Sequence, residues 1–268
     1  TDFQSYKVSR RSTLVTAITT KATTNATITG LAQNTSYTFT VHSCDTAGAC
    51  TASNQISATT APVAGTYVSG IIWGDTTWTL ANSPYVINSL VQIPSGVTLT
   101  IEPGVNVIYT GGTSNIEVHG AIIANGTAGN EIVFRSVADG TNSGATMITL
   151  KSDANASLSQ FDYITMKWGA RGIDSYSISG TLSVSNSTFS NNSAGSGSGG
   201  GICGTTVTVV TVSNSTFSNN SAGSYGGGIY GSTVTVSNST FSNNSASGYG
   251  GGIYGSTVTV SNSTFSNN

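Results

Sequence analysis

The residues able to do acid–base chemistry are few, and they stop well before the end of the chain. The 268 residues include ten Asp and Glu, eight Lys and Arg and two His, so only 7% are charged. Hydrolysis of a glycosidic bond needs two carboxylates about 5–10 Å apart, and a lyase needs a base assisted by cations. One stretch, residues 130–175, offers such groups: Asp153, Asp162 and Asp174, with Lys151, Lys167 and Arg171.

A carbohydrate-active enzyme of lyase or hydrolase type, with its site in residues 130–175, is therefore one hypothesis. The sequence favours the other interpretation, a solvated surface, because the acids are scattered. Residues 175–268 contain no Asp, Glu, Lys, Arg or His, so acid–base catalysis by these groups cannot reside there. His42 and His119 have no partner at metal-ligand spacing, so we expect structural or exposed roles for them. We expect no catalytic residue, cofactor or metal site.

The overall composition excludes further classes of protein. A net charge of −2 leaves no basic face for nucleic acid. No apolar run approaches the roughly 20 residues that a membrane-spanning helix needs. The abundant Ser, Thr, Asn and Gly are poor helix interiors, whereas Val, Ile and Phe recur at regular intervals. The sequence therefore predicts an all-β chain with a periodic core.

An internal repeat predicts the strands that position the side chains. The string Val-Ser-Asn-Ser-Thr-Phe-Ser-Asn-Asn occurs four times, and Gly-Gly-Gly-Ile recurs between the copies. A period near 24 residues, with short β-type runs broken by Gly and Asn, is typical of one coil of a parallel β-solenoid. The four copies of the string are at 184–192, 212–220, 236–244 and 260–268.

The repeat predicts three short strands in each coil and identical residues stacked about 4.8 Å apart. Val234 and Val236 share one side of a strand, and Phe241 has the opposite parity. A corner near 238–240 must intervene if all three point inward. Stacking predicts a core ladder of Met166, Phe189, Phe217, Phe241 and Phe265. It also predicts a hydrogen-bonded amide ladder of Asn192, Asn220, Asn244 and Asn268.

Toward the N-terminus the repeat becomes less regular but continues. Residues 161–166 align on 184–189, and alternating strands continue back to Val97. We therefore predict one solenoid of roughly eight coils over residues 62–268. Its parts are an entrance or cap at 62–96, irregular coils at 97–174 and charge-free regular repeats at 175–268.

Residues 1–61 have a different sequence pattern, in which turns separate short alternating strands. Leu31, Thr35 and the run from Tyr37 to Val41 resemble the second half of a fibronectin type III domain, whose first two strands have no counterpart here. The resemblance implies a partial β-sandwich with a hairpin between Cys44 and Cys50. A disulfide across that hairpin would agree with an oxidising exterior. Cys203 is left as a free thiol, expected at the surface or half buried.

The solenoid carries a second resemblance. Its Phe-x-x-Asn motif, paired with Gly-Gly-x-Ile, resembles the polymorphic outer-membrane-protein repeats of chlamydial adhesins, which usually read Gly-Gly-Ala-Ile. The segment from Ser69 to Trp73 and the run 96–105 resemble the entrance of right-handed parallel β-helices in bacterial surface proteins. These resemblances imply a right-handed β-helix, secretion to the cell surface or exterior, and a structural or adhesive role without a catalytic residue.

Three outward features could recognise a partner. Paired threonines on successive coils are what ice-binding proteins present, although Thr also suits any exposed strand. A surface aromatic stripe of Tyr225, Tyr230, Tyr249 and Tyr254 could stack on glycans or pack over the Gly-rich turn. Candidate N-glycosylation sites are Asn25, Asn34, Asn125 and Asn155.

The sequence thus predicts a non-enzymatic extracellular protein, an elongated β-solenoid stalk with a structural or adhesive role. Its expected partners are host or matrix glycans and proteins, or further copies of itself. Self-association would proceed end to end through open strand edges, or by strand donation to the partial sandwich, and would build a surface fibre.

Overall fold

The chain divides into two compact units, residues 1–63 and 64–268. The computed structural model describes residues 2–23, 25–29, 31, 35–138, 140–176, 178 and 180–268, without the side chains of 176 and 205–208. The candidate glycosylation residue Asn34 lies outside the described residues. Within these ranges there is no α-helix, and a single 3-10 turn, η1 (Leu80–Asn82), lies near the start of the second unit.

The first unit is a five-stranded antiparallel sheet. The ten-residue strand β3 lies at its centre, with β1 on one edge and both β4 and β5 on the other. Strand β2 pairs with the outer edge of β1. The strands are β1 (Phe3–Arg10), β2 (Thr13–Ile18), β3 (Ser36–Asp45), β4 (Cys50–Ala52) and β5 (Ile56–Thr59).

One side of this sheet is apolar and open. Tyr6, Val8, Phe39 and Val41 line a hollow of about 500 Å³ on it, together with Ile56, which is 58% exposed. A β-sandwich would cover such a side with a second sheet. The described residues of this unit form one layer, so the fibronectin type III likeness stays a prediction.

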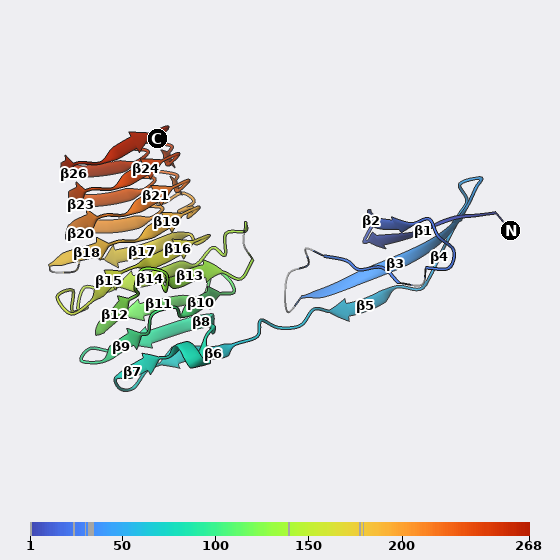
Figure 1. Ribbon diagram of the computed structural model, residues 1–268, viewed down its shortest axis with the longest axis horizontal. Coiled ribbons are helices and arrows are strands. Elements are labelled where there is room, and N and C mark those ends of the chain that lie inside the picture. Colours follow the sequence, from blue (N-terminus) through green and yellow to red (C-terminus); the bar gives the residue numbers. More distant parts are fainter. Residues whose placement is uncertain are drawn as a thin grey trace. The chain divides into compact units, whose positions relative to one another are not determined.

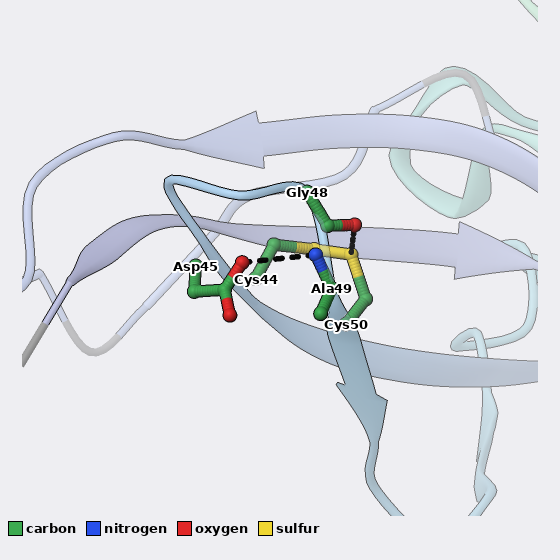
Figure 2. The surroundings of a disulfide bond; sticks show 5 residues. All are labelled: Cys44, Asp45, Gly48, Ala49 and Cys50. Atoms are coloured by element: carbon green, nitrogen blue, oxygen red, sulfur yellow. Dashed lines mark hydrogen bonds between the residues drawn. A yellow bond between two sulfur atoms is a disulfide. The ribbon is translucent and has the colours of Figure 1, made fainter.

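A disulfide closes the hairpin between β3 and β4. Cys44 and Cys50 occupy directly opposed positions of the two strands and are joined by a disulfide bond, as Figure 2 shows. The Asp45 carboxylate accepts a hydrogen bond of 2.9 Å from the amide of Ala49 and so orders the turn. Cys44 is buried, whereas Cys50 is exposed. The bond therefore fixes a hairpin end that contributes little apolar burial of its own.

Reducing this disulfide is expected to destabilise the first unit by about 2 kcal/mol, because the bond closes a short loop in the unfolded chain. Hydrogen exchange of peptides covering β3 to β5 should accelerate on reduction, and equally in Cys44→Ser/Cys50→Ser. The variant Cys203→Ser is the matched control and should leave these peptides unchanged. Equal exchange in oxidised and reduced protein would contradict the prediction.

The second unit is a parallel β-solenoid of about eight turns. Figure 1 shows its strands stacked coil over coil, from β6 and β7 at one end to β26 at the other. The early strands are β6 (Thr66–Ile71), β7 (Thr76–Trp78), β8 (Tyr85–Ile93), β9 (Thr98–Ile101), β10 (Asn106–Tyr109), β11 (Asn115–Val118), β12 (Ala121–Asn125), β13 (Ile132–Ser136), β14 (Thr146–Leu150), β15 (Gln160–Asp162), β16 (Ile164–Lys167), β17 (Arg171–Tyr176) and β18 (Thr181–Ser185). The late strands are β19 (Thr188–Ser190), β20 (Ile202–Ser213), β21 (Thr216–Ser218), β22 (Ser221–Ala222), β23 (Ile229–Ser237), β24 (Thr240–Ser242), β25 (Ser245–Ala246), β26 (Ile253–Ser261) and β27 (Thr264–Ser266).

The coils present three faces, named here in chain order. Face 1 contains β10, β13, β16, β19, β21, β24 and β27. Face 2 contains β11, β14, β17 and the first parts of β20, β23 and β26. Face 3 contains β9, β12, β15, β18 and the second parts of the same three strands. In the regular coils, the strands of faces 2 and 3 are therefore joined into one bent strand, where the sequence predicted two separate strands.

The core is a set of stacked columns. Met166 pairs with Phe189, and the phenylalanine rings then stack coil on coil with centroids 4.8 Å apart. Phe189, Phe217 and Phe241 are fully buried. Close packing explains why the third position of Gly-Gly-Gly-Ile is a glycine. A Cβ on Gly228 would lie 2.5 Å from the carbonyl oxygen of Gly252 and 3.2 Å from the Phe241 ring.

The corner between faces 3 and 1 is made by an asparagine with a positive φ. Val234, Val236 and Phe241 are all fully buried although their parities differ, because Asn238 turns the chain between them with φ 49°. Asparagine tolerates this left-handed region better than other non-glycine residues. The same conformation recurs in a column of equivalent residues: Asn186, Asn214, Asn238 and Asn262.

Two buried polar ladders run parallel to the phenylalanines. Asn220 donates from Nδ2 to the Phe189 carbonyl at 2.9 Å and to Asn244 Oδ1 at 2.9 Å. Its own Oδ1 accepts from the backbone amide and from Nδ2 of Asn192, at 3.1 and 3.0 Å. A second ladder, which sequence reasoning missed, links each Ser Oγ to the amide of the serine one coil earlier: Ser187, Ser215, Ser239 and Ser263. The polar interior of these coils is thus satisfied internally.

Candidate functional site

The register of face 2 assembles the chemically active side chains into one column. Six consecutive pairings link the positions that alternate with buried Val91, Ile116 and Ile173. Polar and charged residues occupy the irregular coils and aromatic residues the regular ones. The members are Gln92, Glu117, Thr149, Asp174, Cys203, Tyr230 and Tyr254.

A charged cluster lies where face 2 turns into face 3. His119, just after β11, contacts Asp153 through Nδ1 at 2.8 Å and Glu117 through Nε2 at 3.0 Å. Lys151, just after β14, forms an ion pair of 3.1 Å with the other oxygen of Glu117. Gln92 of β8 donates to Glu117 at 3.1 Å. Three coils therefore contribute to the cluster.

The cluster favours the charged form of His119. Hydrogen bonds to Glu117 and then to Asp153 raise the pKa of His119 above its ordinary value of 6.5, although burial opposes them. Burial alone would raise the pKa of Glu117, but hydrogen bonds from His119, Lys151 and Gln92 outweigh it and lower that pKa. Both shifts favour an imidazolium that bridges two carboxylates.

This geometry suits an ion-pair lock better than a catalytic centre. Both ring nitrogens of His119 are engaged by carboxylates, so neither is free to take a proton from a substrate. The described residues contain no group of three or more His, Cys, Asp or Glu able to hold a metal ion. The cluster joins Lys151 and Asp153, which start the loop after β14, to β11 of the preceding coil.

The lock predicts that stability depends on pH. The raised pKa of His119 means that its contribution is complete below about pH 6.5, the ordinary value, and is lost as pH rises through the folded value. The loss should be on the order of 1 kcal/mol, since one charge-assisted hydrogen bond at a partly exposed site disappears. Hydrogen exchange of peptides spanning 115–160 at pH 6 and pH 9 measures it.

His119→Gln should remove this difference between the two pH values. His42→Gln, in the first unit, is the control and should retain it. A wild-type protein whose 115–160 peptides exchange with the same protection at pH 6 and pH 9, after correction for intrinsic rates, would contradict the ion-pair lock.

The three acids of the 130–175 hypothesis do not converge on one site. Asp153 belongs to the His119 cluster, and Asp174 lies on face 2, where Arg171 holds it at 3.1 Å. Asp162 lies on face 3 and accepts hydrogen bonds from Ser185 and Asn186. The physical reason is that each coil folds around three faces, so residues 9 to 12 positions apart lie on different sides.

Cys203 is buried rather than half exposed. It is 3% exposed and stacks between Asp174 and Tyr230 on face 2. Burial, followed by the nearby charge of Asp174, raises the pKa of the Cys203 thiol to about 12. Burial also raises the pKa of Asp174, although Arg171 opposes it. The thiol stays protonated at neutral pH, and a protonated thiol is a poor nucleophile.

The four tyrosine rings form two stacked pairs that also contact each other, at the turn into face 2. The rings of Tyr225 and Tyr249 are parallel within 2° and 5.8 Å apart, and those of Tyr230 and Tyr254 are parallel within 3° and 5.9 Å apart. Tyr225 also stacks on Tyr254 at 4.9 Å. Much of each ring face is therefore covered by a neighbouring ring. Tyr249 is the most open of them, at 68% exposure.

The remaining outward features are spread over the surface. Thr233 and Thr235 repeat as Thr257 and Thr259 on face 3 and form a regular hydroxyl array. Asn25 and Asn155 are exposed. The Asn125 amide donates to the side chain of Gln160. Alternation along β11 could have paired Glu117 with His119 in the sequence, but Asp153 is 34 residues further on, outside any repeat.

Comparison with known proteins finds one family model that matches segments of the regular coils. The family model of the Chlamydia polymorphic membrane protein repeat matches residues 186–205, 214–232 and 238–256. No curated protein matches the chain. A solved structure of a Yersinia enterocolitica family 28 exopolygalacturonase is 12% identical, over all of this chain and 82% of its own, with a TM-score of 0.21. That similarity is too low to carry an argument.

No helix among the described residues is long and apolar enough to cross a membrane. The matched segments each contain the asparagine corner, the phenylalanine, the buried Asn and the following Gly-Gly-Gly-Ile turn. A tyrosine follows this turn in the second and third segments, and Cys203 follows it in the first. Three segments of the parallel β-solenoid thus match the Chlamydia polymorphic membrane protein repeat.

Proposed function

We propose that this protein is a non-enzymatic extracellular or surface protein, in which a rigid β-solenoid presents adhesive faces. The matched repeat supports the surface setting, since it is a repeat of Chlamydia polymorphic membrane proteins. A solenoid converts a short repeat into length and stiffness, because each coil packs only on its neighbours. The outward faces remain available for partners.

The observation that carries this proposal is that the charge-free coils point equivalent asparagine side chains, one per coil, into the core. The buried Asn192, Asn220 and Asn244 bond to one another and to the backbone, and Asn244 also bonds to Asn268 of the last coil. Residues 175–268 contain no Asp, Glu, Lys, Arg or His with which to catalyse a reaction. Repetition of identical coils therefore serves structure, and recognition is left to the surface.

Adherence is the direct test. Beads coated with the full chain should bind host cells or matrix proteins in a saturable manner, and soluble full chain should compete. Tyr249→Ser is a matched surface variant, since it changes an exposed ring and removes no core contact. Release of reducing ends from a polysaccharide by the wild-type protein, abolished in Asp153→Asn or Asp174→Asn, would overturn the non-enzymatic proposal.

We further propose that the chain associates with copies of itself through exposed apolar side chains of β26 and β27. Val258, Val260 and Phe265 of these strands are 43%, 44% and 43% exposed, and exposed apolar surface favours association. Sedimentation of the 268-residue chain should show species larger than a monomer that disappear in Val260→Thr/Phe265→Ser. A concentration-independent monomer in the wild type would exclude this route to a fibre.

A further inference from the structure

A polar hollow lies on the outward side of face 3, away from the charged cluster. Its volume is about 590 Å³, and strands β12, β15 and β18 form its floor. Register places Asn125 beside Asp162 and Asp162 beside Ser185. Successive coils thus contribute one amide, one carboxylate and one hydroxyl. The polar side chains used below are Asn125, Gln160, Asp162, Thr181, Ser183 and Ser185.

Hydrogen bonds from the protein fix the orientation of these groups. Ser185 Oγ and Asn186 Nδ2 both donate to the same oxygen of Asp162, at 2.7 and 2.8 Å. Asn125 donates to the side-chain oxygen of Gln160. Each bond restricts a rotatable side chain, so little conformational entropy remains to be lost when a ligand binds. Asn125, Gln160, Asp162 and Ser185 are therefore held in place before a ligand binds.

One polar atom in the hollow has no partner. Asn125 Oδ1 is buried and accepts no hydrogen bond from any residue that the structure describes. A buried carbonyl left unpaired is destabilising, and such groups are rare in folded proteins. Rotating both amides by 180° leaves the Asn125 nitrogen unpaired in its place. Because this oxygen has almost no accessible surface, a ligand donor reaches it only when the Asn125 side chain turns toward the hollow.

The chemistry of the hollow selects the class of ligand. Asp162 offers an acceptor, Gln160 an amide donor, and Thr181 and Ser183 offer hydroxyls that act as either. A molecule with several adjacent hydroxyl groups matches this mixture, because each hydroxyl both donates and accepts. The single carboxylate of Asp162 disfavours anionic ligands by repulsion. It is also too few for a calcium site, which takes six to eight oxygen ligands and usually several carboxylates.

We propose that this hollow binds an uncharged saccharide unit. The inference deepens the proposed adhesive function and rests on it, and it names a neutral glycan as the partner of face 3. The second oxygen of Asp162 accepts a hydroxyl donor from the sugar, and Gln160 donates to a ring or hydroxyl oxygen. Binding is reversible and changes no covalent bond.

The test is binding of the full chain to an array of neutral and uronic-acid-containing oligosaccharides, followed by calorimetry with the best neutral ligand. Wild-type protein should bind neutral members. Gln160→Ala and Asp162→Asn should each weaken binding at least tenfold. Gln160 is exposed, so its loss should leave the fold intact. Thr235→Ala, on the same face but outside the hollow, should bind as the wild type does.

Absence of neutral-glycan binding, binding to acidic members alone, or equal affinity in Gln160→Ala would each overturn the inference. These outcomes differ from failure of the proposed function. If coated beads still adhere to cells while the array shows no glycan, the adhesive function stands and the saccharide site does not. If neither assay shows binding, both fail.

Discussion

Replacing Asn220 with alanine should lower the free energy of unfolding of the regular coils by about 3 kcal/mol, because two buried donors lose their acceptor at about 1–3 kcal/mol each. Those donors are the backbone amide and the side-chain amide of Asn192, both bonded to Asn220 Oδ1. The Phe189 carbonyl loses a donor as well. Urea unfolding, together with hydrogen exchange of peptides covering 184–268, measures the effect.

The neighbouring asparagine provides the matched control for this prediction. Asn219 is exposed and has a φ of 55°, a conformation that glycine adopts without strain. Asn219→Gly should therefore change stability by less than about 0.5 kcal/mol, as surface substitutions usually do. Equal losses in Asn220→Ala and Asn219→Gly would show that the amide ladder contributes nothing specific.

The second large effect is expected at Phe217. Its ring is fully buried and stacks at 4.8 Å on both Phe189 and Phe241. Phe217→Ala should cost about 4 kcal/mol, since it removes the buried ring and leaves a cavity between two coils. Phe265 occupies the same column in the last coil but is 43% exposed, and its replacement by alanine should cost only about 1 kcal/mol.

This pair separates packing from residue type, because both variants make the same chemical change in the same column. The comparison uses urea unfolding under identical conditions, with loss of β-sheet circular dichroism as the signal. Comparable destabilisation by both variants would mean that the phenylalanines do not form a continuous buried ladder. A larger loss at Phe265 than at Phe217 would contradict the coil order itself.

The sequence predicted most of the regular coils because they repeat. Identical strings require identical register, so the pairing of Phe189 with Phe217 and of Thr235 with Thr259 follows from the spacing alone. The corner at Asn238 was predictable from the opposed parity of Val236 and Phe241. The serine ladder was not, because Ser239 looks no different in the repeat from the half-buried Ser237.

The irregular coils resisted prediction for a physical reason. Without a repeat, the sequence does not say how many residues each turn contains, and one residue more or less moves a side chain to the opposite side of a strand. His119 therefore looked isolated, although the fold places it between Glu117 and Asp153. Asp162 looked like part of an acidic group with Asp153 and Asp174, although it lies on another face.

The saccharide hollow belongs to this irregular part. Asn125 and Gln160 are 35 residues apart, and no motif links them. Only the register of β12 with β15 brings them together. The division of labour within the solenoid follows: repeated coils supply a uniform scaffold with a self-contained polar core, and the unrepeated coils supply distinctive surface chemistry.

The coil register is tested most directly by pairs of cysteines on face 3. Thr235→Cys/Thr259→Cys joins residues that lie opposite each other on successive coils, within the reach of a disulfide. Thr235→Cys/Thr257→Cys uses the same face but shifts the pair by two residues, to a Cα separation of roughly 8 Å, beyond that reach. Both are made on a Cys203→Ser background.

The 24-residue solenoid predicts that the first pair forms an intramolecular disulfide on mild oxidation, seen as a loss of two hydrogens in the intact mass, and that the second pair keeps both thiols. Efficient bridging of the shifted pair, with none in the aligned pair, would contradict the register on which the ladders, the faces and the saccharide hollow all depend.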